Sequence, residues 1–298
     1  MSIQKLLVTG ATGETGRRTV QHLLEKGHSV RAMVHKKDER SQALQSQGAE
    51  IVVGDLLNHD DVIRATLGAS AAYFCYPLLP GIIQATAYFA DAAKRAGLGI
   101  VVNMSQIPAR EDAKSPAARD HWIAERIFDW SGVPTTHLRP TLFAQWLLYG
   151  HFRKDIVEQG AIKLPFGNGR HAPITAEDQA RLIAAILVGP VEHVGKTYTL
   201  HGPIEMSQAE IAAAVTEVLG RRVTYQPLTI SQYRTWLQAA ELPEFLIRHL
   251  CEVAIDYQNG ILSGEDKIIA EITGKAPMGV QEFVALHRDA FGPSNAVS

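Results

Sequence analysis

The chain has 298 residues, of which 46% are hydrophobic, 20% charged and 7% aromatic. This composition is that of an ordinary folded chain and excludes wholesale disorder or a fibrous repeat. Lys and Arg number 29 against 31 Asp and Glu, for a net charge of -2, so the chain lacks the positive excess that a nucleic-acid backbone attracts. The length is enough for one large α/β unit or two domains.

Cysteine usage and hydropathy bear on the compartment. The two cysteines, Cys75 and Cys251, lie far apart, and we expect free thiols in a reducing cytoplasm. The start of the chain shows no basic stretch followed by an apolar run, so we expect no secretory signal. An uncharged stretch at 69–90 contains Pro77, Pro80 and Gly81. These residues predict a strand, a loop and a helix start in place of a membrane span.

Strands alternate with helices over the first half of the chain. A strand at 4–9 is followed by a glycine-rich turn and a helix that Gly27 ends. The same alternation continues with helices up to Gly48, at 82–95 and after Ser115-Pro116. The expected strands are 4–9, 29–34, 50–55, 71–75, 99–104 and 135–139. This order predicts an α/β fold with a doubly wound parallel sheet of the Rossmann type.

After Pro140 the pattern becomes more helical. A strand at 196–200 should return to the main sheet, and Ser207 with Glu210 forms a capping box for a helix that Gly220 ends. An edge strand at 221–228 and helices at 231–240, 244–258 and 279–290 complete the pattern. We therefore expect a nucleotide-binding domain at 1–150 plus about 174–200. A smaller, mostly helical α/β substrate domain should cover about 151–173 plus 201–298.

The first strand-to-helix turn carries glycines at a spacing of three and three. The seven residues are Gly10, Ala11, Thr12, Gly13, Glu14, Thr15 and Gly16. In a dinucleotide-binding turn the first glycine permits the tight bend, the second lets the backbone approach a pyrophosphate, and the third lets the helix pack closely. The alternative is a plain glycine-rich turn. A P-loop is excluded because no Gly-Lys-Ser/Thr follows.

The end of the second strand decides between the two nicotinamide cofactors. An acidic residue there binds the ribose hydroxyls of NAD, whereas basic residues suit the 2′-phosphate of NADP. The chain offers Arg31, His35, Lys36 and Lys37, and no carboxylate lies between Gly27 and Lys37. The sequence therefore favours NADP(H) over NAD(H), the alternative being a solvated basic turn.

Two further strand ends should contact the cofactor. Asp55 and Leu56 follow the third strand near the expected adenine, although an exposed loop carboxylate is an equal alternative. Tyr76 and Pro77 follow the fourth strand near the reversal of strand order, where the dinucleotide crosses. Cys75 beside them is expected to be a buried structural thiol.

Taken in order, TGATGETG, VRAMVHK, GDL and HWIAERIFDWSGVPTTHLRP resemble the NmrA-like branch of the atypical short-chain dehydrogenases. The likeness continues through ITAEDQARLIAAILVGP, GKTYTLHGP and VTYQPL, in a succession similar to that of NAD(P)H quinone reductases and triphenylmethane reductases. The resemblance implies an NADP-binding domain, a small C-terminal domain and a cleft for a flat aromatic substrate. It also implies that the glycine loop, His35 where Arg is frequent, Asp55, Tyr76 with Pro77, and Phe143 line the cofactor.

The proton donor of ordinary short-chain dehydrogenases is missing. They use a Tyr with Lys four residues later, because the Lys charge lowers the Tyr pKa. None of the eight tyrosines has Lys at that spacing. His121 and Glu125 stand at i and i+4 in the corresponding helix, either as a proton donor with its orienting carboxylate or as a surface ion pair. Ser105, at the end of the fifth strand, either faces the substrate or caps the strand.

Without a strong acid the hydride acceptor must be electron-poor, because its reduced form is then only weakly basic. We expect a reductase of a quinone, an azo compound or a dye. Aromatic and apolar residues that could stack on such a substrate, or form core, are Trp122, Phe143, Trp146, Leu147, Leu148 and Tyr149.

Other classes of function stay open. The missing pair equally suits a non-catalytic NADP(H) sensor of the NmrA type that acts on a protein partner. An isoflavone-type reductase would need a lysine near the nicotinamide, and Lys114 lies before the helix. The 12 histidines show no metal-ligand spacing, and we expect no metal, no nucleic acid and no membrane partner. The sequence leaves a monomer and a homodimer open.

Overall fold

The computed structural model describes residues 5–292 and forms two compact units. Unit 1 comprises Met1–Arg139, Ala176–Thr199 and Glu271–Gly274. Unit 2 comprises Pro140–Thr175, Leu200–Ala270 and Lys275–Ser298. The roles of a cofactor domain and a substrate domain stay predictions.

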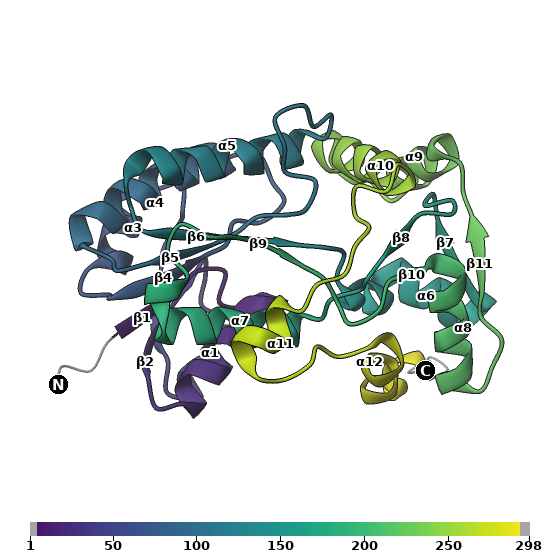
Figure 1. The fold of residues 1–298 in the computed structure, drawn as a ribbon, viewed down its shortest axis with the longest axis horizontal. Coiled ribbons are helices and arrows are strands. Elements are labelled where there is room, and N and C mark those ends of the chain that lie inside the picture. The colour runs from purple at the N-terminus through teal and green to yellow at the C-terminus, as the bar shows by residue number, and fades with distance from the viewer. Residues whose placement is uncertain (1–4, 293–298) are drawn as a thin grey trace. The chain divides into compact units, whose positions relative to one another are not determined.

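Unit 1 is built on a seven-stranded sheet (Figure 1). Its strands are β1 (Lys5–Val8), β2 (Ser29–Val34), β3 (Glu50–Val53), β4 (Ala71–Phe74), β5 (Val101–Met104), β6 (Thr135–Pro140) and β9 (Thr197–Leu200). They lie in the order β3-β2-β1-β4-β5-β6-β9. The first six follow the doubly wound nucleotide-binding order, and β9 is added beside β6. The predicted fold class and the return of 196–200 to the main sheet are confirmed.

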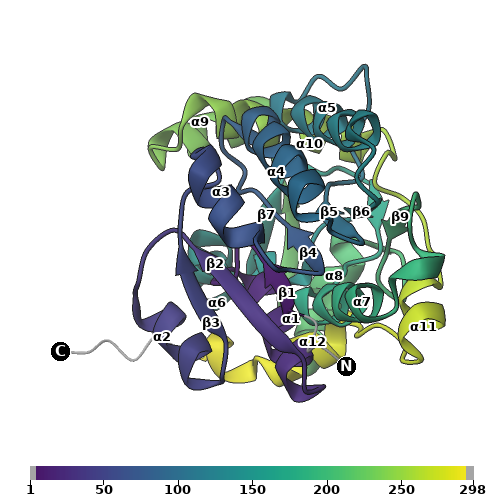
Figure 2. The same cartoon turned by 90° about the vertical axis from the view of Figure 1, so that its left-hand side faces the viewer.

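Helices cover both faces of this sheet (Figure 2). On one face α3 (His59–Thr66) packs on α4 (Ile82–Ala96), and α4 packs on α5 (Pro116–Ser131). On the other face α1 (Glu14–Glu25) packs on α7 (Ala176–Val188). The shorter helices are α2 (Glu39–Ser46), η2 (Pro190–Glu192) and α11 (Ile268–Thr273).

The core of unit 1 follows from strands that are buried on both faces. Every residue of β4 and β5 is buried, as expected where helices cover both sides of a parallel sheet. Phe74 of β4 packs its ring 4.8 Å from Phe89 of α4 and 5.5 Å from Phe128 of α5. These aromatic contacts fix the helices over the sheet.

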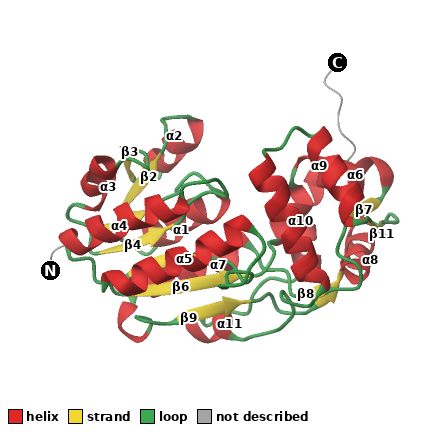
Figure 3. Ribbon diagram, turned by 90° about the horizontal axis from the view of Figure 1, so that it is seen from above, coloured by secondary structure: helices red, strands yellow, loops and turns green. Residues whose placement is uncertain are grey.

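Unit 2 is mostly helical with two short sheets (Figure 3). Its helices are η1 (Ala144–Leu148), α6 (Gly150–Gln159), α8 (Gln208–Leu219), α9 (Ile230–Ala239), α10 (Glu244–Gln258), α12 (Val280–Leu286) and η3 (Arg288–Phe291). Strand β11 (Thr224–Pro227) pairs in parallel with β7 (Ala161–Leu164), and β10 (Met206–Ser207) pairs antiparallel with β8 (Arg170–His171). The predicted capping box at Ser207 and Glu210 is present.

Two smaller expectations concern membranes and thiols. Among residues 5–292, no helix is long and apolar enough to cross a bilayer. Cys75 and Cys251 are both free thiols, as predicted.

Candidate functional site

The glycine loop joins β1 to α1 where the strand order reverses between β1 and β4. Gly10 has a φ of +57°, which residues with a side chain rarely adopt. A Cβ placed on Gly16 would lie 2.2 Å from the carbonyl oxygen of Gly10. Backbone geometry therefore requires glycine at the first and third positions of the motif.

The start of α1 has no side-chain cap. Gly13 is the N-cap residue and makes no side-chain hydrogen bond to the first turn; its own N–H donates to the Gly10 carbonyl at 2.9 Å. Backbone N–H groups at a helix start carry partial positive charge and form a ready anion site. The loop thus fits the diphosphate of a dinucleotide.

The ends of β1 and β4 are tied together beside this loop. Thr9 Oγ1 accepts from the Cys75 N–H at 2.9 Å and donates to the Cys75 carbonyl at 3.2 Å. Burial raises the pKa of the Cys75 thiol, in keeping with a structural role. Tyr76 and Pro77 therefore leave the sheet next to the glycine loop.

Asp55 lies near Tyr76 at this edge of the sheet. Burial and the Asp55 charge together raise the pKa of Tyr76, whose hydroxyl donates to the Pro80 carbonyl at 3.0 Å. Asp55 Oδ1 accepts from the Leu57 N–H at 2.8 Å, and Leu56 packs partly buried against the core. The structure thus brings Asp55 and Tyr76, from two of the predicted strand ends, close to each other.

The basic residues after β2 divide into two groups. His35, Lys36 and Lys37 are exposed beyond the end of the strand. Arg31 lies within β2 and is buried, and its guanidinium donates to Glu50 at 3.0 Å and to the carbonyls of Ala65 and Leu67 at 2.8 and 2.7 Å. These partners use the Arg31 side chain, so the expectation that it binds cofactor is corrected: Arg31 ties β2 to β3 and α3.

A second polar cluster joins β5, α5 and β6. Ser105 Oγ donates to Glu125 Oε1 at 2.6 Å, and Arg139 Nε donates to the same oxygen at 2.9 Å. Glu125 is fully buried, and its carboxylate raises the pKa of Arg139 through their hydrogen bonds. Because Ser105 gives its hydroxyl hydrogen to Glu125, its oxygen can only accept a hydrogen bond from a substrate.

His121 and Glu125 do not form a surface pair. His121 is 5% exposed and Glu125 is 0% exposed, so the surface alternative is wrong. Arg139, which pairs with Glu125, was not predicted from the sequence. A signal existed: Glu125 shares one helix face with the buried Ala118 and Phe128, and a buried carboxylate requires a charged partner.

Of the predicted aromatic and apolar residues, Trp122 is half-buried on α5 of unit 1, and the others belong to unit 2. Phe143 is half-buried, precedes η1 and forms an isolated parallel bridge with Ile174. Leu147 is 1% exposed and belongs to the core, whereas Tyr149 is 47% exposed. Trp146 packs edge-on to Phe152 with ring centres 5.4 Å apart.

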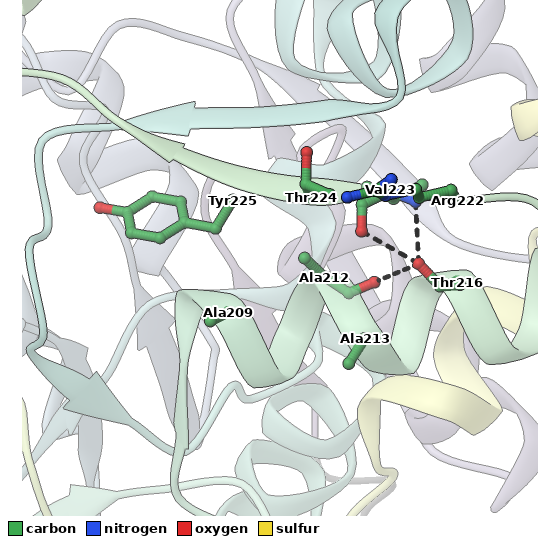
Figure 4. Close-up of a pocket in the computed structure, with 8 residues that line it drawn as sticks. All are labelled: Ala209, Ala212, Ala213, Thr216, Arg222, Val223, Thr224 and Tyr225. Atoms are coloured by element: carbon green, nitrogen blue, oxygen red, sulfur yellow. Dashed lines mark hydrogen bonds between the residues drawn. The ribbon is translucent and has the colours of Figure 1, made fainter.

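A groove of about 450 Å³ in unit 2 lies between α8 and β11 (Figure 4). Its lining residues are Ala209, Ala212, Ala213, Thr216, Arg222, Val223, Thr224 and Tyr225. The Thr216 hydroxyl is already used, since it accepts from the Val223 N–H at 2.8 Å and donates to the Ala212 carbonyl at 2.9 Å. The groove thus offers little chemistry, and the candidate site is the edge of the sheet in unit 1.

Comparison with known proteins adds to this geometry. The model of the NmrA-like family matches residues 2–283. The chain belongs to the NmrA-like family.

Among residues 5–292, no group of three or more His, Cys, Asp or Glu side chains is arranged to hold a metal ion.

Relatives of this family member include three reductases. The NAD(P)H azoreductase of Xenophilus azovorans is 30% identical over 289 residues, covering 96% of this chain and 99% of the relative. Quinone oxidoreductase 2 of Escherichia coli is 25% identical, covering 94% and 97%. The solved triphenylmethane reductase of Citrobacter sp., complexed with NADP(H), is 26% identical, covers 94% and 99%, and has a TM-score of 0.82. These relatives bear out the prediction of an oxidoreductase.

Proposed function

We propose that the protein transfers a hydride from NADPH to a small, electron-poor aromatic acceptor such as a quinone, an azo compound or a cationic dye. The observation that carries this proposal is the uncapped start of α1 behind the Gly10–Gly16 turn, at the reversal of strand order. Dinucleotides bind at that point of a doubly wound sheet. The azoreductase and the triphenylmethane reductase support the class of acceptor.

The cofactor would be held by the backbone of the glycine loop and by strand-end side chains. N–H groups of the first turn of α1 would bind the pyrophosphate. Asp55 and Leu56 would lie near the adenine, and Tyr76 and Pro77 would lie where the dinucleotide crosses the reversal of strand order. Phe143, of unit 2, is proposed as a further cofactor contact on the family resemblance alone.

Preference for NADPH follows from charge at the end of β2. His35, Lys36 and Lys37 are exposed there, and cationic side chains stabilise a 2′-phosphate. The nearest carboxylate, Asp38, is occupied: it accepts from the Ser41 N–H at 3.0 Å and pairs with Arg40 at 2.6 Å. We therefore expect NADPH to bind more tightly than NADH.

The residues around the reacting end suit a weakly basic product. Bound NADPH supplies the hydride, and the protein positions it against the acceptor. Glu125 stands where the Lys of the usual Tyr-Lys pair would lie, and its charge is paired with Arg139. The site therefore lacks the tyrosine of lowered pKa that donates the proton in ordinary short-chain dehydrogenases. His121 would donate the proton, and a reduced quinone or azo nitrogen needs only a weak acid.

Binding and turnover can be tested in one cuvette. Protein fluorescence would follow titration with NADPH and NADH, and absorbance at the nicotinamide band would follow addition of quinones, azo dyes, triphenylmethane dyes and ketones. We expect tighter NADPH binding and oxidation by the aromatic acceptors but not by ketones. Tight binding without oxidation by any acceptor would contradict the reductase and favour the NmrA-type sensor.

Replacement of His121 separates chemistry from binding. His121→Ala should lower kcat by about tenfold to a hundredfold, at or below the usual range for a general acid, while the Kd for NADPH stays nearly unchanged. His59→Ala is a matched control, since His59 pairs with Asp91 on α4. An unchanged kcat in His121→Ala would make His121 part of the scaffold only.

A further inference from the structure

The first residue of α1 places a carboxylate where the proposed pyrophosphate would bind. Glu14 begins the helix directly after Gly13. A helix start attracts any nearby anion, so a free Glu14 carboxylate would compete with a phosphate for the same N–H groups and would repel it. A dinucleotide site with this residue therefore needs a way to keep the carboxylate aside.

Two arginines one turn later supply that restraint. Arg18 Nη1 donates to Glu14 Oε2 at 2.5 Å and to the Glu14 carbonyl at 2.9 Å. Arg17 Nη2 donates to the same Oε2 at 2.9 Å. Arg17 and Arg18 follow Glu14 by three and four residues, so their hydrogen bonds hold the Glu14 carboxylate beside the next turn of α1.

Charge and burial distinguish the two arginines. Partial burial raises the pKa of Glu14, but hydrogen bonds from Arg18 and Arg17 hold it below its ordinary value. The Arg18 side chain is 14% exposed against 46% for Arg17. Ion pairs with little exposure are screened less by solvent. Arg18 is therefore the stronger restraint.

Arg18 is also held from the neighbouring helix. Its Nε lies 3.6 Å from Glu177 Oε2 on α7, and Glu177 Oε1 in turn contacts His22 Nε2 at 2.6 Å. The guanidinium thus lies between the carboxylates of Glu14 and Glu177. This arrangement gives Glu14 one preferred orientation.

We infer that Arg18 is a positioning residue for cofactor binding, which holds the Glu14 carboxylate back from the pyrophosphate site without touching the dinucleotide itself. The inference rests on the proposed function, because it concerns the same cofactor site. It predicts that the effect of losing Arg18 depends on the presence of Glu14.

A double-mutant cycle read by the Kd for NADP⁺ tests this dependence. Arg18→Gln alone should weaken binding by about tenfold, within the range measured for coupled neighbours. Glu14→Gln should bind slightly more tightly than the wild type. The double variant should bind within about twofold of Glu14→Gln. Arg95→Gln, which removes an arginine paired with Asp91 on α4, should leave the Kd unchanged.

The ligand can be varied as well as the protein. Adenosine 2′-monophosphate has no pyrophosphate, so Arg18→Gln should leave its Kd unchanged. A purely structural role would instead lower thermal stability and weaken both ligands alike. An equal loss with and without Glu14, or no loss at all, would overturn the inference. Failure of the wild type to bind NADP⁺ would contradict the proposed function itself.

Discussion

Each unit contains a buried polar cluster, and the two clusters differ in charge. In unit 1 the fully buried Glu125 is ionically paired with Arg139 and accepts from Ser105. In unit 2 the fully buried His171 contacts the Tyr257 hydroxyl through Nδ1 at 2.8 Å. One cluster depends on a pair of charges, and the other depends on a base that stays neutral.

The neutral state of His171 follows from its surroundings. Burial, with a further contribution from the nearby His201, lowers the pKa of His171 to about 3. Gln208 Nε2 donates to the Tyr257 hydroxyl at 3.1 Å, which leaves the phenol hydrogen free to donate to His171. Removal of a partner should therefore damage the cluster in unit 1 most, and acid should damage the cluster in unit 2 most.

The largest expected effect comes from breaking the ion pair. Arg139→Met leaves the buried Glu125 carboxylate with Ser105 and with Arg126, whose Nη2 lies 3.6 Å away. We expect the free energy of unfolding to fall by about 3 kcal/mol, measured by urea denaturation at pH 7. Glu125→Gln in the same chain should restore most of that loss. If the double variant is as unstable as Arg139→Met, the loss of stability does not come from the unpaired Glu125 charge.

Lowering the pH should destabilise the cluster in unit 2 more than the cluster in unit 1. Burial also lowers the pKa of His249 to about 4. Between about pH 6.5 and 4 the unfolded chain binds more protons at His171 and His249 than the folded chain. The free energy of unfolding therefore decreases as the pH is lowered through this range, by about 1.4 kcal/mol per pH unit for each group. The pKa of Arg139 is raised, so Arg139 stays charged throughout this range and loses its proton only in strong alkali.

Urea denaturation at a series of pH values would measure this slope. His171→Asn should reduce the slope by the contribution of one proton, whatever its effect on stability at pH 7. A slope equal to that of the wild type would mean that His171 is not the group that titrates.

A smaller effect is expected from the neutral cluster at pH 7. Tyr257→Phe removes one hydroxyl and leaves Gln208 and His171 without that partner. The expected cost is about 1 to 3 kcal/mol, read from the urea midpoint. Tyr198→Phe is a suitable control, because its hydroxyl contacts His193 at 2.9 Å in a half-buried setting. Equal losses in the two variants would argue against a special cost of burial at Tyr257.

Local patterns predicted the sheet because most of its strands are apolar runs followed by a helix-sized segment, although β3 and β9 are largely half-buried or exposed. They also predicted the helices of unit 2, such as α8, whose capping box and terminal Gly220 are local signals. Strand β7 was not predicted, because its partner β11 lies about 60 residues away in the chain. A two-residue strand such as β8 has no periodicity to detect.

Local sequence likewise predicts only those parts of the candidate site that lie within one segment of the chain. The Gly10–Gly16 turn is contiguous, so its geometry could be read from spacing. The contacts of Glu125 with Ser105 and Arg139 join three elements, and no local pattern shows which side chains meet. Arg31 was misplaced for a related reason: its position in the strand was known, but the neighbouring Glu50 and the carbonyls that it binds were not.

The interrupted course of unit 1 along the chain has a consequence for its synthesis. Helix α7 packs on α1, yet it follows residues 140–175, which belong to unit 2. When the first 139 residues have left the ribosome, α1 still lacks the cover of α7. A nascent chain arrested before Ala176 therefore exposes the surface of α1 that α7 covers in the complete protein, whereas one arrested after β9 contains both helices.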